Sequence, residues 1–380
     1  MIIGAEVTVL GAGIGGLAVA TALAQRGANV RVLEQADEIT EVGAGIQISP
    51  NGVAVLRALG IGAVGGASSA VSLCDGASGG QVLRMALPEG FELVHRADLI
   101  TALAAAARDA GVQIQLGARV QSVDADGAQA VLRMVDGTAS RHDILIGADG
   151  LHAKTRTAVL GDIAPFFTQQ VAWRALIPGR GEPAEARVFM GPGRHLVTYP
   201  LRGGALTNIV AVEERASWAE EGWDHTDDPA NLRAAFAGFC PAVTDMLAQV
   251  EAVNIWGLFR HPVADRWSRG AVVLLGDAAH PTLPFLAQGA VMALEDAWVL
   301  ADELAVHDSR DQAFAAYQVK RKPRATRAIE AANANARNYH LAGVKKTVAH
   351  AGLRMINAVA PQRMLSRFDW LYRHDVTRGD

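Results

Sequence analysis

A short apolar run near the start of the chain opens the first predicted element. Residues 7–10 are apolar or β-branched, a glycine-rich turn follows, and an Ala-rich segment extends from Leu17 to about Arg26. A second apolar run, residues 30–33, ends on Glu34. Because β-branched residues favour strands and alanine favours helices, this order predicts a strand–turn–helix–strand unit, a βαβ unit.

Two later apolar runs have the same character, and each leads into an acidic turn. Residues 144–146 precede Gly147-Ala148-Asp149-Gly150, and residues 271–275 precede Gly276-Asp277. Continuous apolar runs are typical of strands buried on both faces of a parallel sheet. We therefore expect the ends of three separated strands to converge.

The chain between Pro165 and Pro262 has a different pattern. Alternating apolar positions predict an antiparallel sheet from 171–177, 187–190, 195–201 and 207–212, and helical patterns occupy 217–221 and 229–239. The expected fold class is α/β. Its expected parts are a nucleotide-type domain (1–70, 95–164 and 265–320), an inserted antiparallel-sheet domain (71–94 and 165–264) and C-terminal helices (321–380).

Shorter elements are expected between these parts. Asn51 is expected to cap a helix ending at Leu59, and Asp98 to cap a helix over 99–110. Further strands are expected at 71–74, 81–85, 112–116, 118–123 and 128–134, the last two joined by a hairpin at Asp126-Gly127.

The C-terminal quarter of the chain is predicted to be helical from Ala290 onwards. Lys320–Arg324 is interpreted as a solvated helix end rather than a binding patch, and His280 as a structural cap.

The turn after the first strand carries the pattern G-x-G-x-x-G, formed by Gly11, Gly13 and Gly16. In a βαβ unit the first glycine permits a tight turn, the second lets a pyrophosphate approach the backbone, and the third lets helix and strand pack closely. Glu34 lies at the usual spacing of ~20 residues, where an acid accepts a hydrogen bond from a ribose 2′-hydroxyl. Together these features predict dinucleotide binding, and the glutamate argues against a 2′-phosphate.

The composition and net charge of the chain argue against several classes of function. The 380 residues carry a net charge of −4, which gives no electrostatic case for nucleic acid or an anionic membrane. Cys74 and Cys240 form no disulfide framework and suggest a reducing, cytoplasmic compartment. No uncharged apolar run approaches ~18 residues, so we expect no integral membrane association. The histidines show no metal-ligand spacing, so no metal is expected.

Three elements in chain order carry a resemblance to a known family. The Gly11–Glu34 unit, Gly147–Gly150 and Gly276–Pro281 together resemble the single-component FAD-dependent aromatic hydroxylases of the para-hydroxybenzoate hydroxylase type. The Gly43–Asn51 loop and Gln288-Gly289-Ala290 are most similar to the salicylate, 3-hydroxybenzoate and 6-hydroxynicotinate hydroxylase branch. Ala153 departs from the pattern, since family members often have serine there.

The resemblance implies a Rossmann-like FAD-binding domain, non-covalent FAD, and NADH or NADPH as a transient reductant without a Rossmann domain of its own. It implies FAD contacts from four parts of the chain. They are Gly11, Gly13, Ile14, Gly15, Gly16, Glu34 and Gln35; Gly45, Ile46, Gln47 and Arg96; Val120 and Asp149; and Gly276, Asp277, Pro284, Gln288, Gly289 and Ala290.

The implied reaction is hydroxylation of a small aromatic substrate, a phenolic or hydroxy-heteroaromatic acid, with O₂ through a flavin C4a-hydroperoxide. A base beside the phenol helps because phenolate attacks faster. His195 and Tyr199 share one face of a predicted strand and are the candidate catalytic pair, and Pro284 walls the site against water. The candidate substrate contacts are Gln47, Trp173, Arg174 and Phe285, with Arg174 pairing a carboxylate.

Other interpretations stay open at this point. His195 has a structural alternative, Arg96 has one as a surface salt bridge, and Arg174 has one as a solvent-facing residue. The alternative function is a related FAD monooxygenase acting on a larger apolar substrate, such as a quinolone, a polycyclic compound or an alkene. A different class is an FAD-holding binding protein without catalysis. We expect a monomer or homodimer.

Overall fold

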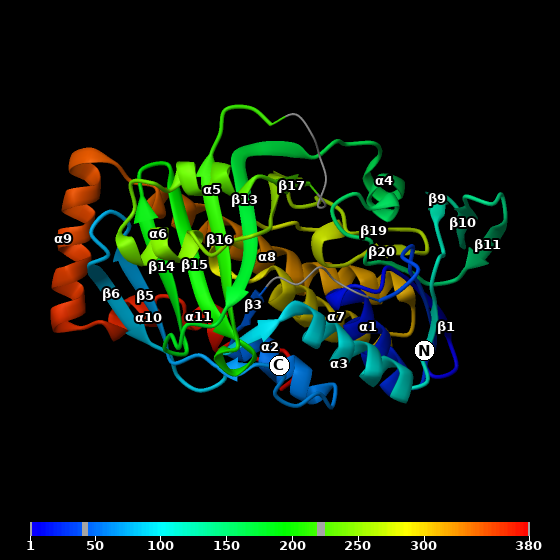
Figure 1. The fold of residues 1–380 in the computed structure, drawn as a ribbon. Coiled ribbons are helices and arrows are strands. Elements are labelled where there is room, and N and C mark those ends of the chain that lie inside the picture. Colours follow the sequence, from blue (N-terminus) through cyan, green and yellow to red (C-terminus); the bar gives the residue numbers. More distant parts are fainter. Residues whose placement is uncertain (1, 40–44, 219–224, 379–380) are drawn as a thin grey trace.

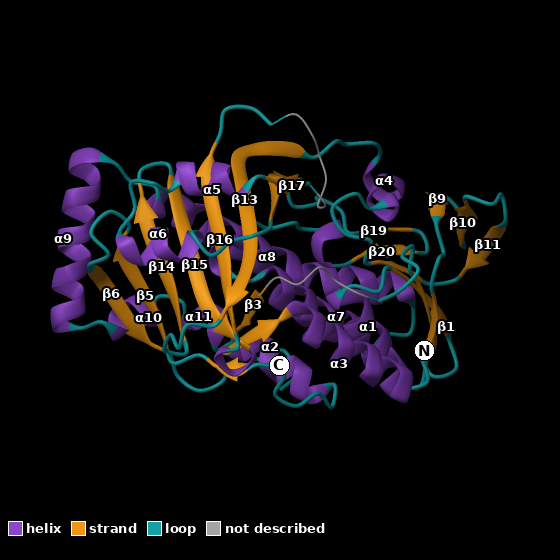
Figure 2. Ribbon diagram, viewed as in Figure 1, coloured by secondary structure: helices purple, strands orange, loops and turns teal. Residues whose placement is uncertain are grey.

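The computed structural model describes residues 2–39, 45–218 and 225–378, and Figure 1 shows their arrangement. A helix-covered parallel sheet lies beside a larger, mostly antiparallel sheet. The long helix α8 (Arg310–Tyr339) joins them, because Phe314 packs in the core around the parallel sheet and Ala336 packs against the larger sheet. Figure 2 shows the large sheet as one layer of strands with α5, α6 and α9 beside it, and α1, α3 and α7 grouped in the other half.

The N-terminal unit forms the centre of a six-stranded sheet with the order β19-β20-β12-β1-β2-β8. All neighbours pair in parallel except β19 and β20, which are antiparallel. The bounds are β1 (Glu6–Leu10), β2 (Asn29–Leu33), β8 (Gln113–Gln115), β12 (Leu145–Gly147), β19 (Ser268–Arg269) and β20 (Val272–Leu274). The carboxyl ends of β1, β12 and β20 therefore meet at one edge, as the apolar runs predicted.

The second sheet has eight strands in the order β17-β18-β13-β16-β15-β14-β5-β6. Its pairs are antiparallel except β14 and β5, which are parallel. The bounds are β5 (Ala70–Asp75), β6 (Gln81–Ala86), β13 (Phe166–Pro178), β14 (Glu185–Gly191), β15 (Arg194–Leu201), β16 (Leu206–Glu214), β17 (Thr226–Asp227) and β18 (Val253–Arg260).

Two three-stranded sheets complete the strands described. The first lies between the larger sheets and contains β3 (Gly45–Ile48), β4 (Gly66–Ala67) and β7 (Glu92–His95). The second lies at one end of the molecule, opposite α9 (Gly343–Val359) in Figure 1, and contains β9 (Val120–Asp124), β10 (Ala130–Met134) and β11 (Ala139–His142).

The longer helices pack against different parts of the molecule. Helix α1 (Ile14–Gln25) is almost fully buried between α3 (Arg96–Asp109) and α7 (Gly289–Val306), while α9 lies against β6. The remaining helices and 3₁₀ turns are α2 (Pro50–Ala58), α4 (Lys154–Leu160), α5 (Pro229–Ala235), α6 (Pro241–Leu247), α10 (Gln362–Ser366), α11 (Asp369–Tyr372), η1 (Arg202–Gly204), η2 (Gly276–Ala278) and η3 (Pro284–Leu286).

Two predicted helix caps were wrong. Helix α3 begins at Arg96, so Asp98 lies in its first turn and pairs with Arg202 at 2.7 Å instead of capping the helix. Helix α2 has Ser49 as its N-cap residue, and the Asn51 side chain turns inward. Residues 217–218 are not helical, and the rest of the helix predicted at 217–221 lies outside the described residues.

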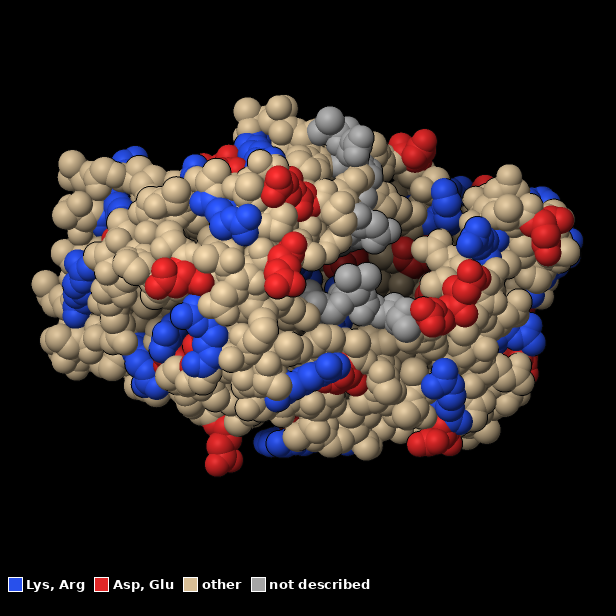
Figure 3. All heavy atoms as spheres, in the orientation of Figure 1, with Lys and Arg blue, Asp and Glu red and all other residues tan. Residues whose placement is uncertain are grey.

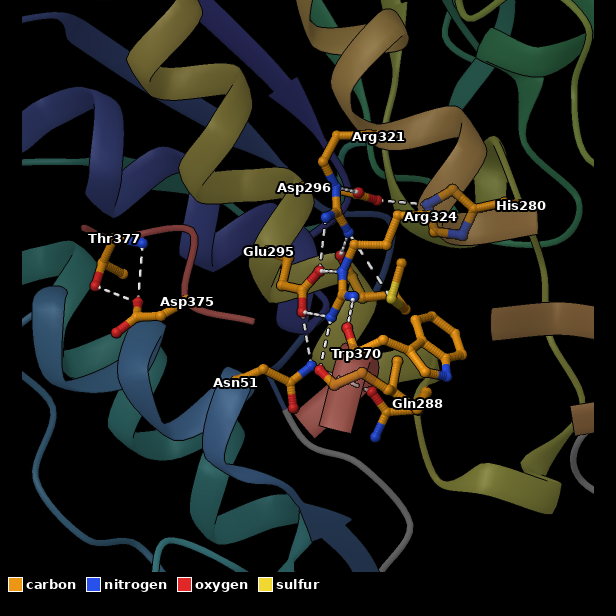
Figure 4. Close-up of polar contacts among 12 residues, drawn as sticks. Asn51, His280, Gln288, Glu295, Asp296, Arg321, Arg324, Trp370, Asp375 and Thr377 are labelled. Atoms are coloured by element: carbon orange, nitrogen blue, oxygen red, sulfur yellow. Dashed lines mark hydrogen bonds and ion pairs between the residues drawn. The ribbon is translucent and has the colours of Figure 1, made fainter. Parts of the chain in front are cut away.

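The interpretation of Lys320–Arg324 as a solvated helix end was also wrong. Helix α8 continues through Pro323, and Arg321 is 1% exposed. Its guanidinium binds Glu295 at 2.6 Å and Asp296 at 2.7 Å, both on α7 (Figure 4). Arg324 binds the other carboxylate oxygen of Glu295 at 2.7 Å. The basic run therefore supplies a buried charge network between two helices.

Within the described ranges, no helix combines the length and the apolar character that a membrane crossing requires. The same ranges contain no group of three or more His, Cys, Asp or Glu side chains placed to hold a metal ion. On the face drawn in Figure 3, basic and acidic side chains are intermixed rather than gathered by sign.

Candidate active site

A cavity of about 330 Å³ lies between the parallel sheet and the large sheet. Its walls come from the turn after β1, from β3, from one face of β13, β15 and β16, and from the turns around η2 and η3. Figure 3 shows a hollow near the centre of the drawn face, between these two halves. The site is thus built where the ends of the parallel strands face the second sheet, the usual ligand position in such folds.

The glycines after β1 play three different structural roles. Gly11 adopts φ +105°, and a Cβ there would lie 2.4 Å from the Ala148 carbonyl oxygen. A Cβ on Gly16 would lie 1.9 Å from the Gly11 oxygen, so this position sets the contact between helix and strand. A Cβ on Gly13 would meet nothing within 4 Å, because this glycine faces the cavity. These positions match the roles expected from the G-x-G-x-x-G pattern.

Two helix N-termini face the cavity without a side-chain cap. Helix α1 begins at Ile14 after Gly13, and helix α7 begins at Gly289 after Gln288. Gly13, Ile14, Gly289 and Ala290 all line the cavity. Because the first N–H groups of a helix carry partial positive charge, both ends favour an anionic or electron-rich ligand group.

Asp277 and Arg96 both line the cavity, and the charge of each influences the pKa of the other. Asp277 is exposed to the cavity, and desolvation by the surrounding protein raises the pKa of its carboxyl group. Burial also lowers the pKa of Arg96, while the Asp277 charge opposes that shift. Among the described residues, none donates a hydrogen bond to the Asp277 carboxylate. Arg96 lines the cavity, where its positive charge favours an anionic ligand group.

One face of the large sheet lines the cavity and carries the two candidate catalytic side chains. His195 and Tyr199 lie four residues apart on β15, and both line it, as their spacing predicted. Gln47 on β3 and the pair Pro284 and Phe285 on η3 line the same space. Burial and the neighbouring His340 lower the pKa of His195 well below its usual range, so its imidazole is neutral at ordinary pH.

Arg174 also faces this cavity from β13, not solvent. Its guanidinium stacks on the Trp256 ring at 4.7 Å, and its Nε–H has no hydrogen-bond partner among the described residues. Burial lowers its pKa to about 10, with Tyr199 opposing that shift and Arg96 adding to it. A buried cation without a carboxylate partner is energetically costly, so the site favours an anionic ligand group.

A second cavity of about 130 Å³ adjoins the first, and six residues line both: Gln47, His195, Val197, Pro284, Phe285 and Ala287. Its remaining lining is mostly apolar, and Phe368 and Tyr372 from the C-terminal helices close it. The six shared residues therefore form a wall that faces both spaces.

Several predicted contact residues lie elsewhere. Trp173 is fully buried on the opposite face of β13 from Arg174, where its indole N–H donates to Asp227 at 2.7 Å. The Gln288 side chain turns away to Ser49 at 2.9 Å. The placement of Trp173 as a substrate contact was therefore wrong, because adjacent strand residues point to opposite faces.

The other residues away from the cavity wall support its turns. The Asp149 carboxylate accepts from the Thr155 hydroxyl at 2.5 Å, which explains how this turn holds without the serine that Ala153 replaces. The Glu34 carboxylate accepts from the backbone N–H of Ala12 at 2.7 Å and of Ala36 at 2.9 Å. Gln35 is exposed and Val120 lies on β9, both outside the cavity lining.

Sequence reasoning missed residues that complete the site. Asn208 on β16 accepts from the Gly45 N–H at 2.8 Å and so fixes β3 against the large sheet. His340 binds His195, and Asp296 accepts from the Gly276 N–H at 3.2 Å behind the Asp277 turn. No local pattern marks these residues, because they act through contacts with residues distant in sequence.

The arrangement fits FAD on three counts. An open cradle lies over Gly13, two uncapped helix N-termini face the cavity, and the Asp277 carboxylate is an acceptor without a donor among the described residues. Phosphates suit the first helix end, ribityl or ribose hydroxyls suit the carboxylate, and an electron-rich ring suits the second helix end. Gly43, the first residue of the Gly43–Asn51 loop, lies outside the described residues.

Comparison with known proteins agrees with this fit. A family model described as FAD binding domain matches residues 4–332. A 3-hydroxybenzoate 6-hydroxylase from Polaromonas naphthalenivorans is 35% identical over 390 residues, covering 97% of this chain and 96% of that protein. A 6-hydroxynicotinate 3-monooxygenase from Bordetella bronchiseptica is 34% identical over 343 residues, covering 85% of this chain and 89% of that protein.

A solved structure shows the same architecture. HpxO from Klebsiella pneumoniae, complexed with FAD and uric acid, superposes with a TM-score of 0.83 at 27% identity. The match covers 96% of this chain and 95% of HpxO. From the family model, the relatives and this structure, we conclude that the chain belongs to the single-component FAD-dependent aromatic hydroxylases.

Proposed function

We propose that this protein hydroxylates a small aromatic acid bearing a ring hydroxyl, using bound FAD, NADH or NADPH, and O₂. The observation that carries the substrate class is Arg174, a buried guanidinium on the cavity wall that has no acidic partner among the described residues. The relatives support it, since their names describe hydroxylases of 3-hydroxybenzoate and 6-hydroxynicotinate. Those substrates are small aromatic acids, which favours this function over a larger apolar substrate.

The side chains around the cavity have distinct tasks in this proposal. Arg174 pairs the substrate carboxylate, with its guanidinium plane held on Trp256. His195 accepts the phenolic proton, so that the ring is attacked as the more nucleophilic phenolate. Pro284 and Phe285 exclude water from the reacting face.

FAD, when bound, supplies the electrons and the activation of O₂ for transfer to the ring. The N-terminus of α7 at Gly289 and Ala290 would stabilise negative charge on the pyrimidine edge of the reduced cofactor. The chain thus provides orientation, electrostatics and exclusion of water.

Replacing Arg174 with glutamine is expected to raise KM for hydroxybenzoates about 10- to 100-fold, the value of a lost charge-assisted hydrogen bond. Phenols without a carboxylate should show no comparable change, because they do not use the guanidinium. Steady-state kinetics on matched pairs of compounds measure this difference. Arg187→Gln is the control, since Arg187 pairs with Glu185 outside the cavity. Equal losses for both compound classes would refute carboxylate binding by Arg174.

Replacing His195 with alanine is expected to slow hydroxylation about 10²- to 10⁴-fold, the usual worth of a general base. Flavin reduction should be largely kept, because it requires no phenolate. Rapid-mixing measurements of the two half-reactions separate these steps. Unchanged coupling of product to NAD(P)H at every pH would remove His195 from this role.

The reductant, the compartment and the assembly state remain predictions of the sequence. We propose NADH or NADPH as electron donor, a cytoplasmic location, and a monomer or homodimer. A panel of hydroxybenzoates, hydroxypyridines and quinolones, each tested with both nicotinamides and scored for product, tests the function and the donor together. Light scattering of the purified protein measures the assembly state.

A further inference from the structure

A chain of hydrogen bonds among three side chains connects the cavity to the protein surface. His195 Nδ1 lies 2.7 Å from His340 Nε2, and His340 Nδ1 lies 2.7 Å from Glu214 Oε1. The His195 and His340 side chains are buried, whereas 53% of the Glu214 side chain is exposed. His195 lines both cavities, so the line runs from the candidate substrate space to solvent.

The carboxylate at the outer end dictates the proton positions along this line. An ionised Glu214 only accepts hydrogen bonds, so His340 must carry its proton on Nδ1. A neutral His340 then has a lone pair on Nε2, which requires the proton of His195 to be on Nδ1. The remaining nitrogen, His195 Nε2, is left as an unprotonated acceptor, and no described residue occupies it.

We propose that His340 and Glu214 are positioning residues that hold His195 in its basic tautomer and conduct the substrate's phenolic proton to solvent. The proposal rests on the proposed function, because it assumes a phenolic substrate beside His195. It explains why a buried histidine pair ends on a surface carboxylate rather than in the apolar core.

Each step of the proposed relay breaks one bond to a proton and forms another, so the number of protons is conserved. The phenol O–H bond breaks as His195 Nε2 gains that proton, and His195 Nδ1 passes its own proton to His340 Nε2. His340 Nδ1 then passes its proton to a Glu214 carboxylate oxygen, which exchanges it with water. No electron moves, and the reverse sequence returns a proton when the product phenol is re-formed and restores both tautomers.

The surroundings keep both imidazoles neutral. Burial lowers the pKa of His195 and of His340, and the Arg194 charge lowers the pKa of His340 further, while Glu214 opposes that shift. The Tyr339 ring lies 5.2 Å from His195, and burial raises the pKa of Tyr339 to about 12, so it stays protonated. Glu213 is held by Arg194 and Arg215. A neutral pair serves as a relay, whereas a charged pair would repel the next proton.

The test uses the FAD-loaded full-length protein and the chromophoric ligand 3-hydroxy-4-nitrobenzoate, whose phenolate absorbs visible light. Glu214→Ala is the first variant, because its exposed side chain can be removed without opening the core. Glu214→Asp is the conservative variant, and His340→Phe interrupts the line at its centre. Glu213→Gln is the matched control, since it removes a charge from the same strand outside the relay.

We expect the wild type to ionise the bound ligand at a lower pH than free ligand does. Glu214→Ala and His340→Phe should shift that titration upward by about 1 pH unit or more and slow hydroxylation about 10- to 100-fold, within the range of a misdirected base. Flavin reduction and melting temperature of Glu214→Ala should match the wild type. Glu214→Asp should recover much of the effect, and Glu213→Gln should resemble the wild type.

Two results would overturn the relay. One is a Glu214→Ala variant whose bound ligand titrates and whose hydroxylation rate varies with pH as in the wild type. The other is an equal effect of Glu213→Gln, which would assign the change to surface charge. A wild type that binds no hydroxybenzoate would instead overturn the proposed function, and the relay with it, so the two failures are distinguishable.

Discussion

Asp277→Ala is expected to purify without flavin and to bind added FAD at least about 100-fold more weakly, because an ionised acceptor of hydroxyl hydrogen bonds is lost. The carboxylate opens onto the cavity and has no donor among the described residues, so its position serves a ligand rather than the fold. Burial raises its pKa, which means that the free protein bears an electrostatic cost at this site. The flavin-free variant should therefore melt no lower than the flavin-free wild type. Absorbance of bound flavin and thermal melting measure both quantities.

Two further variants sharpen this test. Asp277→Asn keeps one acceptor oxygen and should bind FAD with intermediate affinity. Asp302→Ala removes a half-exposed acid of α7 that pairs with Arg26, and it should retain full flavin. An Asp277→Ala protein with a full complement of cofactor would show that the carboxylate does not hold FAD.

Arg321→Met is expected to destabilise the protein by about 3–5 kcal/mol, because it leaves Glu295 and Asp296 buried with too little positive charge. Both carboxylates are fully buried, and Arg321 lies between them (Figure 4). The loss should also weaken FAD binding, since Asp296 accepts from the Gly276 N–H and from His280 behind the Asp277 turn. Urea denaturation followed by tryptophan fluorescence measures the stability change.

Lys322→Met is the matched control for this variant. Lys322 lies one residue further along α8 but reaches the exposed Asp265, so its loss should shift the denaturation midpoint far less. Equal shifts for the two variants would show that the buried network is not what stabilises this region.

The same network predicts a loss of stability in acid. Burial opposes ionisation of Asp296, yet His280 and Arg321 hold its pKa down at about 2. A depressed pKa contributes stability that is fully present above the unfolded value of about 3.9 and is lost as pH falls through 2. In Arg321→Met this contribution should shrink, so the midpoint should vary less steeply between pH 4 and pH 2.

The features that the sequence could predict are local. A β-branched run, three glycines and an Ala-rich helix specify the turn after β1 within a few residues, and the parallel strands follow from continuous apolar runs. Because parallel strands end at one edge, the acidic turn at Asp277 could be placed beside the glycines from spacing alone. The face of β15 was predictable too, since His195 and Tyr199 must share a side.

The remaining features depend on contacts that the local pattern does not encode. Period-two alternation says that Trp173 and Arg174 point oppositely, but not which of them faces the cavity. A basic run ending in Lys322-Pro323 is typical of a helix end, and only the packing of α8 on α7 shows Arg321 paired with two buried acids. His340 stands at the end of α8 in no motif, 145 residues from the histidine it contacts.

Hydroxylation under oxygen-18 gas is the most direct test of the proposed activity. The purified protein, supplied with FAD, NADH or NADPH and the hydroxybenzoate panel, is predicted to form a ring-hydroxylated product containing one labelled oxygen atom. Its yield should follow NAD(P)H consumption and fall in His195→Ala. If every compound gives only labelled hydrogen peroxide and no hydroxylated ring, or if the protein takes up no FAD, the account is contradicted.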